Sequence, residues 1–184
     1  MRIKEPKPKS CKVCGEKFIP RSSTQKACSV SCAYEIVRQT KVKKERANDR
    51  IKKLNLKTRR EWLADAQVSF NAYIRERDKN QPCICCGKPL AQESVGGGFD
   101  CGHYRSVGSA PHLRFNEDNA HGQRKVCNRY GGGRAVDYRI GLIQRIGLTR
   151  VEALESDNDP KKWDIEELKA IKQYYNQKLK QLRK

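Results

Sequence analysis

Nine cysteines in close groups constrain the fold of this 184-residue chain more than any other feature. Four lie within the first 32 residues, and the other five lie between positions 83 and 127. No apolar leader follows the N-terminal methionine, so we expect a reducing compartment, where closely paired cysteines bind metal rather than form disulfides. With only 4 Phe and 2 Trp, the chain offers little for one large core, which favours small metal-supported units.

The first cysteine cluster has the spacing Cys11-x2-Cys14-x13-Cys28-x3-Cys32. Two close pairs separated by a short loop allow four thiolates to surround Zn²⁺ tetrahedrally. Because four thiolates leave no position open for water, this site is predicted to be structural. We therefore predict a zinc finger over residues 1–36.

The next segment, residues 37–80, is predicted to be a basic helical arm. Between positions 38 and 60 it carries eleven Lys or Arg against two acidic residues. It has too few large apolar residues there for a buried face, so we expect exposure to solvent. Thr58-x-x-Glu61 has the pattern of a capping box and predicts a second helix start. The side chains predicted to contact DNA are Lys41, Lys43, Lys44, Arg46, Lys52, Lys53, Arg59 and Arg60.

The net charge of +19 concerns partners rather than fold. Such a surface attracts polyanions, and nucleic acid is the partner we expect. No apolar run approaches the length of a membrane-spanning helix. The basic segments also lack a wide apolar face with Trp or Phe, so the sequence disfavours a membrane partner.

The second cluster combines cysteines with polar residues that a structural zinc does not explain. Cys83, Cys86 and Cys127 supply three thiolates. Beside them in the sequence lie the polar residues Asp100, His103, Asn119 and Asn128. Alone, an Asp or Asn at a turn indicates only turn chemistry, so these residues gain weight from their combination.

In its order of Cys-x-x-Cys, Asp-x-Gly-His-Tyr, Asn and Cys-Asn, this region resembles the HNH, or ββα-metal, nucleases. More narrowly, the chain resembles the NinG family of lambdoid phages, also called Rap, which are structure-specific recombination endonucleases. The resemblance includes the Arg-Glu-Arg-Asp stretch at 75–78, Leu-Arg-Phe-Asn-Glu at 113–117 and the segment 163–183. It implies an α+β protein of small zinc-stabilised domains, located in the host-cell cytoplasm. A treble-clef-like HNH domain is expected over 81–147 and C-terminal helices over 148–184.

The resemblance also implies roles for individual residues. His103 matches the general base that activates water, a task that suits an imidazole near neutral pH. Asn128 matches a ligand of the catalytic Mg²⁺ or Mn²⁺ ion, and Asp100 is its expected carboxylate partner. Asn119 matches an Asn that braces the loop carrying the base.

Two features depart from the family pattern at the second zinc site. Arg124 stands where the family usually has a cysteine, so one thiolate is missing. We expect Cys101 to replace it, while Cys85 is a weaker candidate because adjacent cysteines rarely bind one metal in the same turn. His103 and His121 are alternative zinc ligands, and His121 is an alternative phosphate contact.

The second departure concerns Asp100 and His103. On a regular strand their side chains point to opposite faces, and we expect Gly102 to allow a bulge that reunites them. Farther along the chain, Thr149-x-x-Glu152 and Asp164-x-x-Glu167 are predicted to cap two C-terminal helices.

The leading functional hypothesis is a metal-dependent endonuclease acting on branched recombination intermediates, such as Holliday junctions and D-loops. One alternative is a non-catalytic zinc-dependent nucleic-acid-binding phage regulator, which shares the charge and zinc sites but has no need of His103. Another is an HNH nuclease without branch specificity. Two symmetric cuts in a junction would suit a homodimer formed through the apolar stripe of the last helix.

Overall fold

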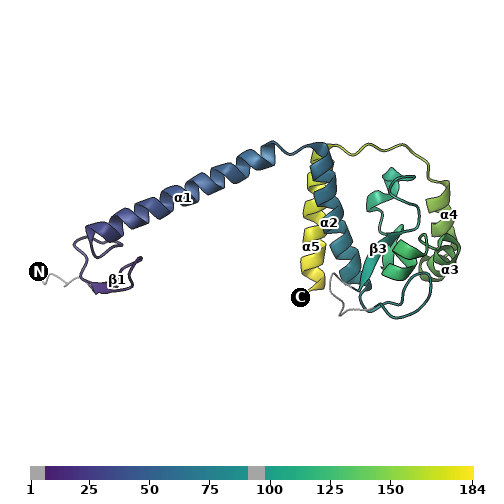
Figure 1. Ribbon diagram of the computed structural model, residues 1–184, viewed down its shortest axis with the longest axis horizontal. Helices are drawn as coiled ribbons and strands as arrows, with labels where there is room; N and C mark the ends of the chain where they lie inside the picture. Colours follow the sequence, from purple (N-terminus) through teal and green to yellow (C-terminus); the bar gives the residue numbers. More distant parts are fainter. Residues whose placement is uncertain (1–6, 91–97) are drawn as a thin grey trace, which may run out of the picture. The chain divides into compact units, whose positions relative to one another are not determined.

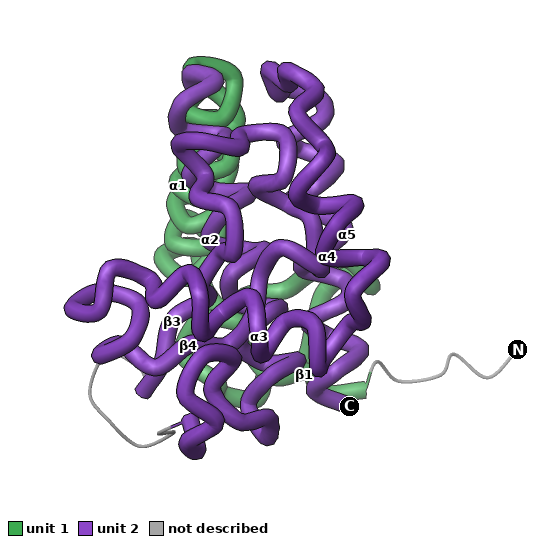
Figure 2. The backbone as a smooth tube through the Cα atoms, turned by 90° about the vertical axis from the view of Figure 1, so that its right-hand side faces the viewer, with its two compact units in different colours: residues 1–57 green, residues 58–184 purple. Residues whose placement is uncertain are grey.

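A computed structural model describes residues 7–90 and 98–184, so the first six residues of the predicted finger lie outside it. The chain divides into two compact units, residues 1–57 and 58–184 (Figure 2). The division falls inside the predicted arm 37–80, between its two helices, because only the second of these helices joins a hydrophobic core.

The first unit consists of a small hairpin followed by one long helix. Strands β1 (Lys9–Ser10) and β2 (Lys17–Phe18) pair antiparallel, and α1 (Val30–Asn55) follows (Figure 1). The Ser29 side chain caps α1 by accepting a hydrogen bond from the Cys32 amide. No residue of α1 is buried, which confirms the predicted exposed basic helix.

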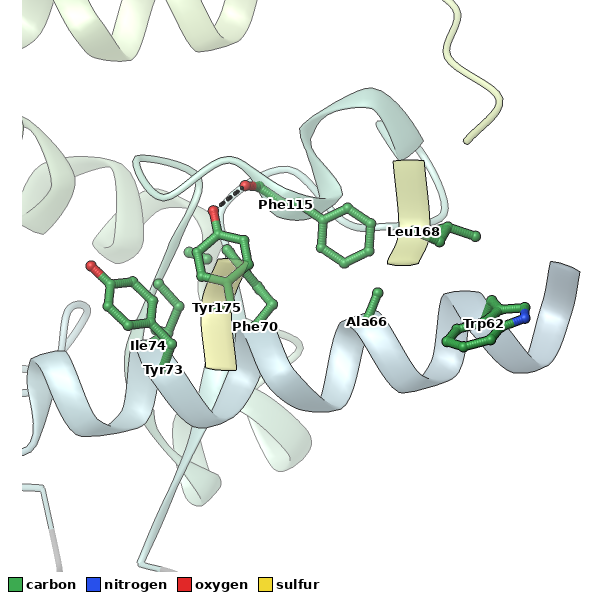
Figure 3. Packing of buried hydrophobic residues seen from close by; sticks show 9 residues of the cluster. Trp62, Ala66, Phe70, Tyr73, Ile74, Phe115, Leu168 and Tyr175 are labelled. Atoms are coloured by element: carbon green, nitrogen blue, oxygen red, sulfur yellow. Dashed lines mark hydrogen bonds between the residues drawn. The ribbon is translucent and has the colours of Figure 1, made fainter. Parts of the chain in front are cut away.

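The second unit is centred on α2 (Arg59–Asp78) and α5 (Ile165–Leu182), which lie side by side (Figure 1). Both begin with the predicted capping boxes, Thr58 with Glu61 and Asp164 with Glu167. Their facing sides enclose an aromatic core, in which the Tyr175 hydroxyl donates to the Phe115 carbonyl at 3.0 Å (Figure 3). The buried members of this α2–α5 core are Trp62, Ala66, Phe70, Tyr73, Ile74, Phe115, Ala120, Leu168 and Tyr175.

A two-stranded antiparallel sheet of β3 (Phe99–His103) and β4 (Ala120–Arg124) packs beside α2. Its register is regular from Phe99↔Arg124 to His103↔Ala120, so the bulge expected at Gly102 is absent. Gly102 has a different function. A Cβ at this position would collide with the Gln123 side chain, so the glycine makes room for that residue.

A second, smaller core receives buried residues from the 3₁₀ helix η1 (Pro111–Phe115), α3 (Ala135–Ile146) and α4 (Leu148–Ser156). The π-helical turn η2 (Val126–Tyr130) instead contributes Cys127 to a third cluster, with Cys83, Leu90 and Phe99. The prediction that Thr149 caps α4 is wrong, because the helix already begins at Leu148. Gly147, with φ of 86°, makes the preceding turn. Apart from the two small sheets, the described chain is thus mainly helical, and none of its helices is long and apolar enough to cross a membrane.

Candidate metal centres

The four cysteines of the first cluster come together as predicted. Sulfur atoms of Cys11, Cys14, Cys28 and Cys32 all lie within 4.8 Å of one another, and all four are free thiols. Gly15, with φ of 79°, makes the turn after the first pair, and its amide donates to the Cys11 carbonyl at 3.0 Å. A group of four thiols fits a closed zinc site.

The backbone around this cluster prepares it for a cation. Amide hydrogen bonds from Cys14 and Val13 are the main causes that lower the pKa of Cys11 to about 6. A thiol with such a pKa is largely ionised at neutral pH, and the thiolate is the form that binds metal. The loop geometry thus favours the thiolate at Cys11, whereas the pKa values of Cys14 and Cys28 are raised, so the cation itself would have to stabilise their thiolates.

The second cluster brings together three of its predicted ligands. Cys83, Cys86 and Cys127 have sulfur atoms within 4.8 Å of one another. The turn seen at Gly15 recurs at Gly87, which has φ of 66° and whose amide donates to the Cys83 carbonyl at 3.0 Å. Unlike the first, this cluster packs against buried apolar residues, including Phe99.

The predicted fourth ligand, Cys101, does not join this group. It projects from β3 toward the α2–α5 core, and burial raises the pKa of its thiol to about 12. The histidines considered as zinc ligands are also engaged elsewhere. His103 Nε2 lies 3.0 Å from the Arg114 carbonyl oxygen, and His121 Nε2 lies 3.1 Å from the carbonyl oxygen of Asp118.

Asp100 and Asn128, the predicted ligands of the catalytic ion, are in contact. The Asn128 side-chain amide donates to the Asp100 carboxylate at 3.1 Å, and Arg129 makes a bidentate salt bridge to the same group at 2.8 and 2.9 Å. Burial acts to raise the pKa of Asp100, but the bonds from Arg129 and Asn128 hold it below its usual value. The π-helical turn after Cys127 thus presents two consecutive residues to an ionised carboxylate.

His103 lies on the opposite face of β3 from Asp100, as the regular strand requires. A carbonyl oxygen can only accept, so His103 Nε2 carries the proton toward Arg114 and Nδ1 keeps its lone pair. Burial, partly against Phe70 with ring centroids 5.9 Å apart, lowers the pKa of His103. The ring is therefore a neutral imidazole at pH 7, with Nδ1 available to accept a proton.

Asn119 makes the bracing contacts predicted for it. Its fully buried side chain donates to the carbonyls of Arg105 and Leu113 at 3.0 and 3.2 Å, and it accepts from the Arg105 amide at 2.8 Å. One amide therefore ties together both sides of the segment between His103 and β4. Replacing it would leave buried backbone groups unpaired.

A buried ionic network went unnoticed in the sequence. Asp78, only 3% exposed, pairs with Arg77 at 2.6 Å and accepts from the Gly122 amide at 2.7 Å. Arg77 in turn donates to His121 Nδ1 at 3.0 Å. The sequence pattern that could have indicated this network is the position of Asp78, four residues after Ile74 and therefore on the buried face of α2. This network fixes β4 against the end of α2.

The basic residues predicted to contact DNA are exposed in both units. Six lie on α1, where no packing competes for them: Lys41, Lys43, Lys44, Arg46, Lys52 and Lys53. Arg59 and Arg60 begin α2, and Arg59 also donates to the Trp163 carbonyl at 3.2 Å. Free cationic side chains along a helix suit contact with a phosphate backbone.

Comparison with known proteins supports the NinG part of the resemblance. A family model described as "Bacteriophage Lambda NinG protein" matches residues 3–184. Protein ninG of Escherichia phage lambda is 42% identical over 188 residues, covering 92% of this chain and 90% of that protein. Protein ninG of Escherichia phage 933W is 40% identical over 197 residues, with coverage of 97% and 96%. No solved structure matches. The chain belongs to the NinG protein family of lambdoid phages.

Proposed function

We propose that this NinG protein is a metal-dependent endonuclease that cuts branched DNA, such as Holliday junctions and D-loops, in phage recombination. The observation that carries the proposal is a contact at 3.1 Å between Asn128 and Asp100. Asn128 directly follows Cys127 of the second cysteine cluster. The second cysteine cluster, once it holds zinc, would fix the position of Asn128 beside Asp100, and the oxygen atoms of these two side chains could then bind a second ion. HNH, or ββα-metal, architecture is part of the same proposal.

The donor sets suit two kinds of ion. Thiols fit Zn²⁺, whereas the Asp100 carboxylate and the Asn128 amide oxygen fit Mg²⁺ or Mn²⁺, which keep several water ligands. When bound, the second ion would stabilise negative charge on the scissile phosphate and the leaving oxygen. Arg129 neutralises Asp100 in the structure, so Asn128 and Asp100 must exchange these contacts to serve as ligands.

His103 supplies the proposed general base. Its Nε2–H group is anchored on the Arg114 carbonyl, which orients the ring and leaves Nδ1 to take a proton from water. Asn119 holds the segment that carries Arg114. His103 and Asp100 project from opposite faces of β3, so the base and the ion ligands need separate tests.

A cleavage assay on a four-way junction and on linear duplexes of the same sequence, with Mg²⁺ or Mn²⁺, tests the proposal. We expect preferential cutting of the junction, and a loss of about 10²–10⁴-fold in rate for His103→Ala with junction binding retained. His112→Ala is the matched control, because its Nε2 also lies near a carbonyl oxygen, that of Asp157 at 2.9 Å. Wild type that binds junctions and never nicks them with any divalent ion excludes the enzyme.

A non-catalytic zinc-dependent nucleic-acid-binding regulator is the second candidate. The salt bridge of Arg129 favours it, because a carboxylate already paired with a guanidinium is less available to an ion. This candidate predicts tight, strongly salt-dependent binding, unchanged by His103→Ala and without cleavage. Equal cutting of branched and linear DNA would instead indicate an HNH nuclease without branch specificity.

A further inference from the structure

The second cysteine cluster is one thiolate short. Its mutually close sulfur atoms are those of Cys83, Cys86 and Cys127, whereas structural zinc is almost always four-coordinate. Cys101 lies against the α2–α5 core instead. The fourth ligand must therefore come from another group near the cluster.

Cys85 is the nearest unused thiol. Its sulfur lies 3.7 Å from the Cys83 sulfur, and it packs at the edge of the apolar shell that contains Cys127. This half-buried free cysteine also packs against the smaller core that contains Ile84 and Tyr138.

A buried amide is aimed at the same sulfur. Gln123, 1% exposed, donates from Nε2 to Cys85 Sγ at 3.1 Å and to the Gly133 carbonyl at 2.8 Å. Gly102 leaves the space that this side chain occupies. Hydrogen bonds from an outer shell orient metal ligands and support their charge, and an N–H donor suits a thiolate.

Arg124 lies beside the second cysteine cluster, at the position where the family usually has a cysteine. Its spacing to Cys127 is that of a Cys-x-x-Cys pair, and its backbone amide donates to Cys83 Sγ at 3.3 Å. Its guanidinium reaches the Cys86 sulfur at 4.0 Å. Arg124 thus lies at the cluster but has no thiol, whereas Cys85 lies beside Cys83 of the same cluster and has one.

We propose that Cys85 is the fourth zinc ligand of the second site, together with Cys83, Cys86 and Cys127, and that Gln123 supports its thiolate. Cys85 stands outside the group of three mutually close sulfurs, so its side chain turns inward when it binds. Two adjacent cysteines on one ion restrict the geometry, so this site binds zinc more weakly than the first. The proposal does not depend on nuclease activity.

The test uses the full chain, with zinc content measured after equilibration against a graded chelator and with the absorption spectrum of the Co²⁺-substituted protein. We expect Cys85→Ser to weaken the weaker-binding zinc by at least about 10–100-fold, the range seen when outer-shell partners are lost. Its thiolate-to-Co²⁺ charge-transfer band should fall as well. Cys101→Ser is the matched control and should change neither quantity. Unchanged zinc affinity and spectrum in Cys85→Ser would overturn the proposal.

A rescue variant keeps the test decisive if Cys85→Ser folds poorly. Adding Arg124→Cys to Cys85→Ser returns a thiol to the cluster from a different position. We expect the double variant to regain the wild-type zinc content and charge-transfer intensity. A double variant that binds zinc no better than Cys85→Ser contradicts the assignment. Because every readout is zinc or Co²⁺ binding, failure here leaves the endonuclease proposal untouched.

Discussion

The two units use their cysteines in different ways. Within residues 7–57 the buried positions are Cys11, Pro20 and Ala27, and α1 contributes none. The described residues of the second unit form three hydrophobic clusters, one of which includes Cys83 and Cys127. A metal ion bound in the first unit would therefore take the place of a core, whereas one bound in the second would reinforce a core.

Removal of zinc should have the largest effect, and it should separate the two units. Structural zinc contributes about 10–16 kcal/mol of apparent binding free energy in small zinc-finger peptides. With little else buried, the β1–β2 hairpin should lose its structure in excess chelator, while α2 and α5 keep theirs. Hydrogen exchange resolved by residue measures both. Unchanged protection of the hairpin after zinc loss would show that metal does not replace a core there.

Truncation of a side chain in the α2–α5 core should produce the reverse pattern. Phe70 is fully buried and packs edge-on against Phe115 and Tyr175 at centroid distances of 5.7 and 4.8 Å. Phe70→Ala should lower the unfolding free energy of the second unit by about 3–5 kcal/mol. Zinc binding by the first unit should not change.

Chemical denaturation with a probe in each unit measures this effect. Val68→Ala on the same helix is the matched control, because Val68 is 68% exposed and its truncation should stay within about 0.5 kcal/mol. Weaker zinc binding at Cys11 and its partners in Phe70→Ala would mean that the units are energetically coupled.

A pH-dependent loss of stability is expected in the second unit, because all three histidines lie there. Burial lowers the pKa of His121, so the unfolded chain binds its proton more readily than the folded chain. The stability that neutral His121 provides is fully present above its ordinary pKa of about 6.5, and it is lost as pH falls toward the lower folded value.

Asp78 acts at lower pH in the same direction. Burial opposes its ionisation, but His121 at 3.6 Å and the hydrogen bonds from Arg77 and the Gly122 amide hold the pKa of Asp78 well below its usual value. Its contribution is therefore lost only in strong acid. Unfolding of the second unit, followed between about pH 7.5 and 5, should lose part of its pH slope in His121→Gln. An unaltered slope would remove His121 from the explanation.

Most features that depend on local chemistry were predictable from the sequence, although the cap expected at Thr149 does not form. The four-cysteine spacing and the capping boxes at Thr58 and Asp164 involve residues within a turn or a short loop of one another, and the structure contains all of them. The bracing contacts of Asn119 followed from the family resemblance, since the residue pattern alone does not indicate which carbonyls it meets.

Features that depend on register were not predictable. Cys101 packs against the α2–α5 core and not with the second cysteine cluster, although the regular register of β3 with β4 puts it on the same face as Phe99, which does pack there. The same register removes the bulge expected at Gly102. The pairing of Asp78 with the Gly122 amide joins residues 44 positions apart, and no spacing rule connects them. The sequence therefore predicted contacts between residues close in the chain more reliably than contacts between distant residues.

The smallest expected effects come from removing the N-terminal caps of α1 and α2. Thr58 and Glu61 form a reciprocal capping box on α2, whereas Ser29 accepts one bond, from the Cys32 amide at 3.3 Å. Thr58→Ala should lower the unfolding free energy of the second unit by about 1 kcal/mol, because α2 is part of its core. Thr58→Ser keeps the acceptor and serves as the control.

Ser29→Ala should act locally. Since α1 has no buried face, fraying of its first turn disturbs no packing, and the consequence is limited to the amides near Cys32 and a slightly weaker zinc site. Faster hydrogen exchange confined to residues 30–33 is the expected result. If Ser29→Ala instead unfolds the whole first unit with zinc bound, the cap rather than the metal holds that unit together, and the contrast between a metal-made unit and a core-made unit fails.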